Sequence, residues 1–273
     1  MSSSGTSLGN MLSLMRFASS FPSPPERGPG LECHPGQLER VDEFAPARGE
    51  PHPHGSFGLD ERAVVPRSFI AELLRECLRP WLVREPKQVL DLCTGSGCLA
   101  VLLALTFVKA RVDAADLSSK ALEVAKINIR KYQLEKRVRA VRSDLFQSLD
   151  PKQYDLIVCN PPYVTARSTR KLPKEYRHEP AFALAAGKDG LDLVHRILAQ
   201  AKDWLTPGGL LCCEIGGNRK ALARAYPRVE FLWPQTSDPR AVFILERAQL
   251  LATPGARTAG GEGTPPMRAR AQR

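Results

Sequence analysis

The stretch Val89-Leu90-Asp91-Leu92-Cys93-Thr94-Gly95-Ser96-Gly97 decides the fold, because an apolar strand runs here into a glycine turn and a helical run follows at once. Glycine has no Cβ, so such a turn lets a ligand approach the backbone closely. Asp116 lies 19 residues beyond Gly97, at the end of the next expected strand, where a carboxylate can accept both ribose hydroxyls of an adenine nucleoside. The stretch therefore predicts the nucleoside-binding half of an α/β fold.

The glycine turn by itself does not identify the nucleoside. The pattern Gly95-x-Gly97-x-x-Ala100 with a later acid also fits the dinucleotide fingerprint, so NAD and S-adenosylmethionine both remain open at this point. Two features favour S-adenosylmethionine. Asp91 precedes the glycines, near the charged methionine end of that cofactor, and no third glycine lines a pyrophosphate path. Ser143-Asp144 closes the third expected strand, where an adenine amino group needs an acceptor, although a helix or turn cap is the alternative role for Asp144.

Short apolar or β-branched runs alternate with longer helical ones, which is typical of a mostly parallel sheet covered on both faces. Strands are expected at 88–92, 112–116, 138–142, 155–159 and 210–215, and helices at 68–81, 98–107, 119–132 and 190–204. The last two runs, 229–233 and 241–246, have no helix between them and predict an antiparallel pair at one edge. The expected fold is a Rossmann-like, seven-stranded α/β sheet with an antiparallel edge hairpin.

The two ends of the chain differ in composition from its middle. Residues 1–55 mix Ser, Gly and Pro with scattered charge and show no sustained period, so we expect a disordered or atypical amino-terminal segment. The tail 251–273, rich in Gly, Pro, Ala and Arg, is expected to be disordered too. A single catalytic domain is therefore predicted over residues 56–250.

The cysteines and the hydropathy pattern limit the class of protein. Seven cysteines, an odd number without repeated metal-ligand spacing, are interpreted as small buried hydrophobes of a reducing compartment, so neither a disulfide framework nor a metal site is expected. No apolar run approaches the roughly 18 residues that a membrane helix needs. We expect a soluble, cytoplasmic protein.

The formal net charge of +10 belongs mainly to the part of the chain that is expected to fold. One basic group, within residues 126–142, fits a solvated helix face at least as well as a polyanion site. A second group lies beside the expected site and leaves nucleic acid open as a neighbour: Arg167, Arg170, Lys171, Lys174 and Arg177.

The chemistry is indicated by Tyr154-Asp155-Leu156-Ile157-Val158-Cys159-Asn160-Pro161-Pro162-Tyr163. A buried strand delivers Asn160 to the carboxyl end of the sheet, where open α/β folds bind their ligands. The two prolines fix φ and remove two backbone donors, so the turn is stiff and presents bare carbonyl oxygens. An NH₂ group has two hydrogens to donate, and the Asn160 side-chain oxygen and the Pro161 carbonyl can accept both.

Such a turn suits a poor nitrogen nucleophile. When a carboxamide nitrogen attacks a methyl group, positive charge develops on its hydrogens, and fixed acceptors stabilise that transition state more than the ground state. Tyr163 would pack its ring over the planar group and hold it in a near-attack pose. No His or Lys is evidently placed as a general base. Asn160, Pro161 and Tyr163 are accordingly the predicted catalytic residues of a methyltransferase.

The chain from about residue 56 to 250 resembles the ribosomal-protein and release-factor glutamine N5-methyltransferases, most closely the branch that modifies a glutamine of the third protein of the large ribosomal subunit. The resemblance is carried by these segments: Leu59-Asp60-Glu61-Arg62-Ala63-Val64-Val65-Pro66-Arg67-Ser68, Leu90-Asp91-Leu92-Cys93-Thr94-Gly95-Ser96-Gly97-Cys98, Arg142-Ser143-Asp144-Leu145-Phe146, Asn160-Pro161-Pro162-Tyr163-Val164, Leu172-Pro173-x-Glu175-Tyr176-Arg177-His178-Glu179-Pro180 and Ala186-Gly187-x-Asp189-Gly190-Leu191.

The resemblance implies a class I methyltransferase fold with S-adenosylmethionine as methyl donor. It implies that the turn made by Cys93, Thr94, Gly95, Ser96 and Gly97 surrounds the methionine part of the cofactor. Asp116 would bind the ribose, Asp144 and Leu145 would flank the adenine, and Asn160, Pro161, Pro162 and Tyr163 would bind a glutamine side chain. The loop 165–188 would cover the site, where its basic residues would meet ribosomal RNA or the protein substrate.

Two alternative functions stay open on the sequence. An adenine N6-methyltransferase acting on DNA or RNA would use the same Asn160 to Tyr163 turn, although no added base-recognition element is visible. Residues 1–55 do not resemble the helical amino-terminal domain of that family, so a cofactor-binding but inactive, truncated methyltransferase is the second alternative. An NAD-dependent reductase is a more distant third.

Overall fold

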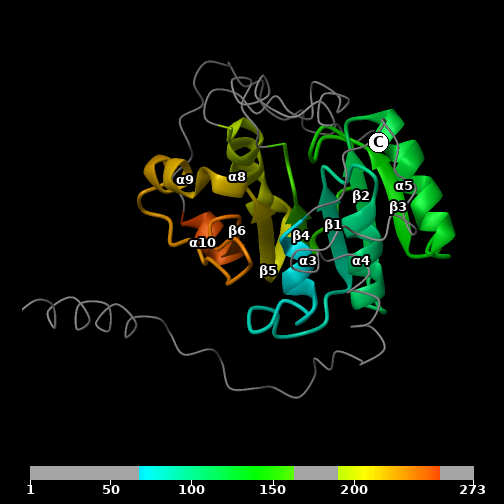
Figure 1. The fold of residues 1–273 in the computed structure, drawn as a ribbon, viewed down its shortest axis with the longest axis horizontal. Coiled ribbons are helices and arrows are strands. Elements are labelled where there is room, and N and C mark those ends of the chain that lie inside the picture. Colours follow the sequence, from blue (N-terminus) through cyan, green and yellow to red (C-terminus); the bar gives the residue numbers. More distant parts are fainter. Residues whose placement is uncertain (1–67, 163–189, 253–273) are drawn as a thin grey trace, which may run out of the picture.

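The computed structural model describes residues 68–162 and 190–252, and its centre is a six-stranded sheet in the order β3-β2-β1-β4-β5-β6 (Figure 1). The first five strands are parallel, and β6 pairs antiparallel with β5. The strands are β1 Gln88–Leu92, β2 Arg111–Asp116, β3 Val138–Arg142, β4 Tyr154–Cys159, β5 Leu205–Glu214 and β6 Val242–Glu246. The predicted mostly parallel α/β sheet with an antiparallel edge is thus confirmed.

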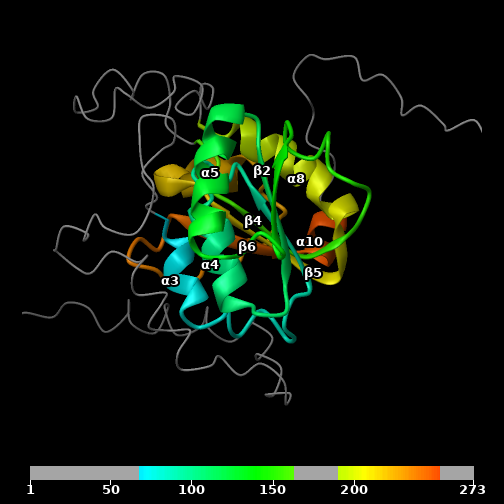
Figure 2. The same cartoon turned by 90° about the vertical axis from the view of Figure 1, so that its right-hand side faces the viewer.

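Helices cover both faces of this sheet. Figure 2 shows α3, α4 and α5 on one side of the strands and α8 and α10 on the other. Two separate hydrophobic clusters fill the spaces between the sheet and these two layers. The helices are α3 Ile70–Leu74, α4 Cys98–Thr106, α5 Ser119–Lys131, α8 Asp192–Trp204, α9 Arg219–Ala225 and α10 Arg247–Leu251, and a 3₁₀ turn spans Gly216–Asn218.

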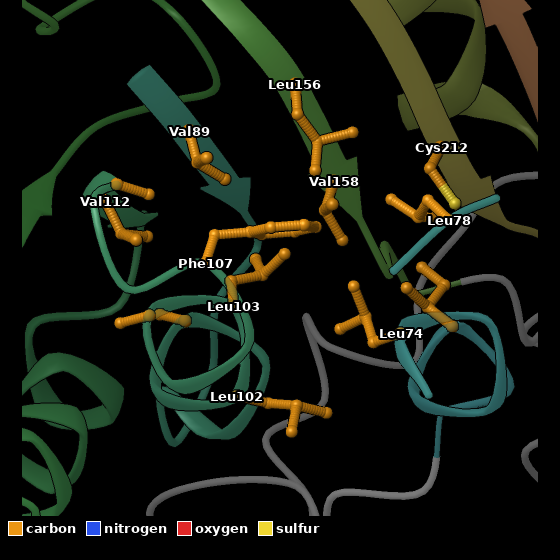
Figure 3. Packing of buried hydrophobic residues seen from close by; sticks show 14 of the residues in the cluster. Leu74, Leu78, Val89, Leu102, Leu103, Phe107, Val112, Leu156, Val158 and Cys212 are labelled. Atoms are coloured by element: carbon orange, nitrogen blue, oxygen red, sulfur yellow. The ribbon is translucent and has the colours of Figure 1, made fainter. Parts of the chain in front are cut away.

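Alternation along the central strands assigns each side chain to one of the two clusters. Leu156 and Val158 of β4 belong to the cluster on the α3 and α4 side, whereas Ile157 and Cys159 belong to the other. Figure 3 shows Val158 on the same side of the sheet as Leu74 of α3 and as Phe107, the residue that follows α4. Successive side chains of a strand point to opposite faces, so a strand buried on both faces is apolar throughout.

The helix expected at 68–81 is shorter in the structure, because α3 ends at Leu74. Cys77 and Leu78 adopt positive φ angles of 52° and 56°, which no α-helix contains. This left-handed turn carries Leu78 into the core, where its side chain is fully buried. Burial of Leu78 thus takes the place of continued helical hydrogen bonding.

The expected edge hairpin is reduced to one bridge, so the described sheet has six strands and not seven. Leu232 and Ile244 exchange both backbone hydrogen bonds, at 3.1 and 2.8 Å, but the neighbouring residues form no ladder. Instead, Phe231 and Trp233 pack their rings against Phe243, with centroids 5.1 and 6.1 Å apart. Aromatic packing thus holds this segment where a longer strand was predicted.

Within residues 68–162 and 190–252, every helix is too short or too polar to cross a lipid bilayer. The segments predicted to be disordered or atypical, 1–55 and 251–273, lie outside the described residues except for Leu251 and Ala252.

Candidate functional site

The carboxyl ends of β1, β4 and β5 lie side by side and bring together three polar residues from distant parts of the sequence. The register pairs Leu92 with Cys159 and Cys159 with Cys213, so Asn160 and Glu214 follow at neighbouring positions. Asp91 lies one residue before Leu92 on the adjacent strand. Parallel α/β sheets bind ligands at this edge, and it is the edge at which the sequence places the candidate site.

Asp91 is a buried carboxylate with one unused oxygen. Its side chain is 1% exposed, and its Oδ2 accepts a hydrogen bond of 2.5 Å from Thr94 Oγ1. Its Oδ1 is buried and has no hydrogen-bond partner among the described residues. Burial, with a smaller contribution from the nearby Asp116 carboxylate, raises the pKa of Asp91 to about 7. A buried polar atom without a partner is costly, so Oδ1 is poised to accept from a ligand group.

The turn from Cys93 to Gly97 leaves open space at its tip. Cys93 and Gly95 have positive φ angles of 57° and 56°, and nothing lies within 4 Å of a Cβ built on Gly95. A Cβ on Gly97 would lie 2.9 Å from Ala125 Cβ, because α4 and α5 approach each other closely there. Gly97 is therefore needed for helix packing, whereas Gly95 leaves room for a ligand.

Asp116 ties the end of β2 to the glycine turn. Its Oδ2 accepts a hydrogen bond of 2.9 Å from the Gly95 amide, and its Oδ1 accepts one of 2.8 Å from the Ser118 amide. Burial raises the pKa of Asp116 above its usual value. Each carboxylate oxygen can accept a second hydrogen bond, so Asp116 can still receive two hydroxyl groups.

Asp144 forms an ion pair that sequence reasoning missed. Arg196 of α8 donates from Nη2 to both carboxylate oxygens of Asp144, at 2.9 Å each. Leu145, the next residue, is buried and has a φ of 51°, and its carbonyl accepts a hydrogen bond of 2.7 Å from Ser143 Oγ. The sequence around Arg196 holds no signal for this contact, because the partner lies 52 residues away.

The Asn160 turn is described as far as Pro162. Asn160 and Pro162 are half-buried, and Pro161 is buried. Tyr163, the third predicted catalytic residue, lies outside the described residues, as do the basic residues of the loop 165–188. The structure therefore brings Asn160 and Pro161 to the predicted edge beside Asp91.

Glu214 is a second polar residue that the sequence analysis did not single out. Its side chain is fully buried, and its Oε2 accepts hydrogen bonds from Ser68 Oγ at 2.6 Å and from the Phe69 amide at 2.9 Å. A signal was present, because Glu214 is a charged residue inside the otherwise apolar run 210–215.

Free thiols surround the strand ends. Burial raises the pKa of the Cys159 thiol well above its usual value and that of Cys98 to about 12, so both stay neutral. In the described parts of the chain, no group of three or more His, Cys, Asp or Glu side chains could hold a metal ion.

Comparison with known proteins gives consistent results. The family model "Methyltransferase small domain" matches residues 70–175. Curated relatives named "Ribosomal protein uL3 glutamine methyltransferase" include one from Neisseria meningitidis, which is 52% identical over 198 residues, or 71% of this chain and 65% of the relative. One from Bordetella pertussis is 51% identical over 219 residues, or 77% of this chain and 73% of the relative. The chain thus spans about 65% of the length of the Neisseria relative.

Among solved structures, the hMettl16 catalytic domain in complex with an RNA hairpin of the MAT2A 3'UTR is similar, with a TM-score of 0.50 and 17% identity over 70% of this chain and 73% of that chain. At this level of identity the similarity concerns the fold alone.

Proposed function

The chain belongs to the family of ribosomal protein uL3 glutamine methyltransferases, and we propose that it transfers a methyl group from S-adenosylmethionine to the side-chain N5 of a glutamine in uL3. The observation that carries this proposal is that the strands leading to Asp91 and Asn160 are neighbours, so that a methyl-donor site and an acceptor site would lie side by side. We take residues 56–250 as the domain that performs the reaction.

The residues at the ends of β1 and β2 fit S-adenosylmethionine. The cofactor supplies an electrophilic methyl group on a sulfonium. It also carries an ammonium group, which can donate a hydrogen bond to the unused Oδ1 of Asp91. The open space at Gly95 suits the methionine part, within the turn that also includes Cys93 and Ser96. Asp116 would accept the ribose hydroxyls, and Asp144 and Leu145 would flank the adenine.

The acceptor amide is proposed to bind at Asn160. The Asn160 side-chain oxygen and the Pro161 carbonyl would accept the two hydrogens of the glutamine NH₂, with Tyr163 packing over the amide plane. As the amide nitrogen bonds to the methyl carbon and the sulfonium–methyl bond breaks, positive charge would grow on these hydrogens and strengthen both hydrogen bonds. One of the two hydrogens would then leave as a proton, which restores the neutral amide. One such acceptor contributes roughly 3–4 kcal/mol to lowering the barrier. The basic residues of the loop 165–188 would contact the protein substrate or the adjoining ribosomal RNA.

The proposal is tested by incubating the protein with radiolabelled S-adenosylmethionine and unmethylated large-subunit components. Protease and nuclease digestion then locate the label. Label on uL3 that is lost when the target glutamine is replaced would support glutamine methylation. Nuclease-sensitive label would favour the adenine N6 alternative, and absence of label despite cofactor binding would contradict transfer by this chain.

A further inference from the structure

Glu214 connects two parts of the chain that are far apart in sequence. Its Oε2 accepts hydrogen bonds from Ser68 Oγ and from the Phe69 backbone N–H, which lie 146 and 145 residues away in the sequence. Ser68 and Phe69 immediately precede α3, which is anchored by the fully buried side chains of Ile70 and Leu74. The carboxylate thus fixes the start of α3 to the end of β5.

Alternation places Glu214 on the same face of the sheet as Asn160. Leu156 and Val158 of β4, and Leu210 and Cys212 of β5, all lie in the cluster on the α3 side. Figure 3 shows Val158 and Cys212 on that side, facing Leu74 and Leu78. Continuing the period of two by one step puts Asn160 and Glu214 side by side on this face, beyond the apolar cluster.

A buried carboxylate at this position needs a reason. Burying a charge is costly unless donors compensate it, and a hydrophobic side chain would satisfy the core at lower cost. Two donors to Glu214 come from Ser68 and Phe69, which immediately precede α3. These hydrogen bonds offset the lost hydration of the carboxylate and hold the start of α3 at the end of β5.

We infer that Glu214 is a positioning residue for methyl transfer, which holds Ser68 and Phe69 as a wall beside Asn160 and thereby sets the position of the acceptor amide. This inference rests on the proposed function. Glu214 acts through hydrogen bonds and need not exchange a proton or contact the cofactor. Because Oε2 accepts the bonds from both Ser68 and Phe69, the amide oxygen of a glutamine at this position can accept the same two bonds.

The chain offers a matched pair of serines to test this inference. Ser237 Oγ donates to Glu72 Oε1 at 2.5 Å, so it also links α3 to a distant loop, but at an exposed position. Ser68→Ala and Ser237→Ala therefore each delete one serine-to-glutamate hydrogen bond at α3. Only Ser68 donates to Glu214, which lies at the end of β5 beside the strand that leads to Asn160.

The experiment measures kcat and KM for methylation of unmethylated large-subunit components, together with the Kd for S-adenosylmethionine by calorimetry. Misplacement of reacting groups by about 1 Å can lower the rate about 100-fold, so Glu214→Ala is expected to lower kcat to that extent with the cofactor Kd little changed. Glu214→Gln should restore most of kcat. Ser68→Ala should lower kcat clearly more than Ser237→Ala.

Several outcomes would overturn the inference. Wild-type kcat in both Glu214→Ala and Ser68→Ala would remove the positioning role. A Glu214→Gln variant as slow as Glu214→Ala would show that the charge matters and not the position. Parallel loss of cofactor affinity and kcat would indicate a general structural role. If the wild-type protein itself labels no uL3, the proposed function fails and this inference falls with it.

Discussion

Arg196 Nη2 lies 2.9 Å from both carboxylate oxygens of Asp144, which connects the loop after β3 to α8 across the proposed adenine side of the site. The two side chains are 41% and 35% exposed, so water screens their attraction. A carboxylate has about four acceptor positions, and Arg196 uses two of them. Asp144 can therefore be oriented by Arg196 and still accept an adenine amino group.

Arg196→Gln is expected to weaken S-adenosylmethionine binding modestly. Partly exposed ion pairs contribute about 0.2–1 kcal/mol, so the Kd should rise by at most about fivefold. Calorimetric titration measures it, with Arg240→Gln as control, because Arg240 also pairs with an aspartate, Asp238, but outside the site. Equal Kd values for the two variants would show that the Arg196 pair does not orient the adenine.

Cofactor affinity should increase as pH rises through the region of the Asp91 pKa. In the cofactor-free protein that pKa is about 7, because the side chain is buried. A bound ammonium favours the ionised carboxylate, so binding releases a proton below about pH 7. Calorimetry at pH 6 and pH 8, in buffers of different ionisation enthalpy, measures both effects.

Asp91→Asn should bind the cofactor weakly and without this pH dependence, whereas Asp203→Asn, which changes an exposed aspartate on α8, should behave as wild type. A wild-type pH profile in Asp91→Asn would assign the proton to another group.

Asp91 should also make the cofactor-free protein less stable as pH rises from about 4 to about 7. Its pKa is 3.8 in the unfolded chain and about 7 in the folded one. Between these values the folded state binds more protons, so the free energy of unfolding falls with pH. The stability gain of Asp91→Asn over wild type should therefore grow from pH 4 to pH 8, to an upper limit of about 4 kcal/mol. Urea unfolding at both pH values measures it, and a gain independent of pH would contradict the raised pKa.

Asn160→Ala should separate transfer from cofactor binding. Loss of one preorganised acceptor costs roughly 3–4 kcal/mol of barrier, so kcat should fall about 100-fold to 1,000-fold. In Asn160→Ala the cofactor Kd should stay close to the wild-type value. In Asp116→Ala, by contrast, the main effect should be a higher cofactor Kd. The measurements are single-turnover methylation and calorimetry. Equal losses of affinity and rate in Asn160→Ala would mean that Asn160 serves the cofactor.

Gly97→Ala should destabilise the fold more than Gly95→Ala does. Both glycines have positive φ, which costs an L-residue about 1–2 kcal/mol. Only at Gly97 would the new Cβ also meet Ala125, at 2.9 Å. Urea unfolding compares the two variants, and the pair Gly97→Ala with Ala125→Gly should recover part of the loss. No recovery in the pair would show that the clash with Ala125 is not the cause.

Much of the fold was predictable because its signals are local. The bounds of β1 and β3 agree with the prediction residue for residue. In β1 a mainly apolar run between turn residues marks a buried strand, whereas β3 is a β-branched edge strand of which only Val138 is buried. The polar residue that follows such a run, as Asn160 does, indicates the ligand-binding edge before any coordinate is known. By contrast, the end of α3 at Leu74 depended on Leu78 entering the core, which the helical period could not indicate.

The sequence by itself determined the α/β class, the glycine turn after β1 and the stiff turn after Asn160, because each depends on interactions among residues close in the chain. Only the tertiary structure decided that Glu214 would meet Ser68 and that Arg196 would meet Asp144. Those contacts depend on which strands are neighbours and on the face that each side chain occupies. Strand order and packing bring together residues 146 and 52 positions apart, and no local pattern of residues encodes that proximity.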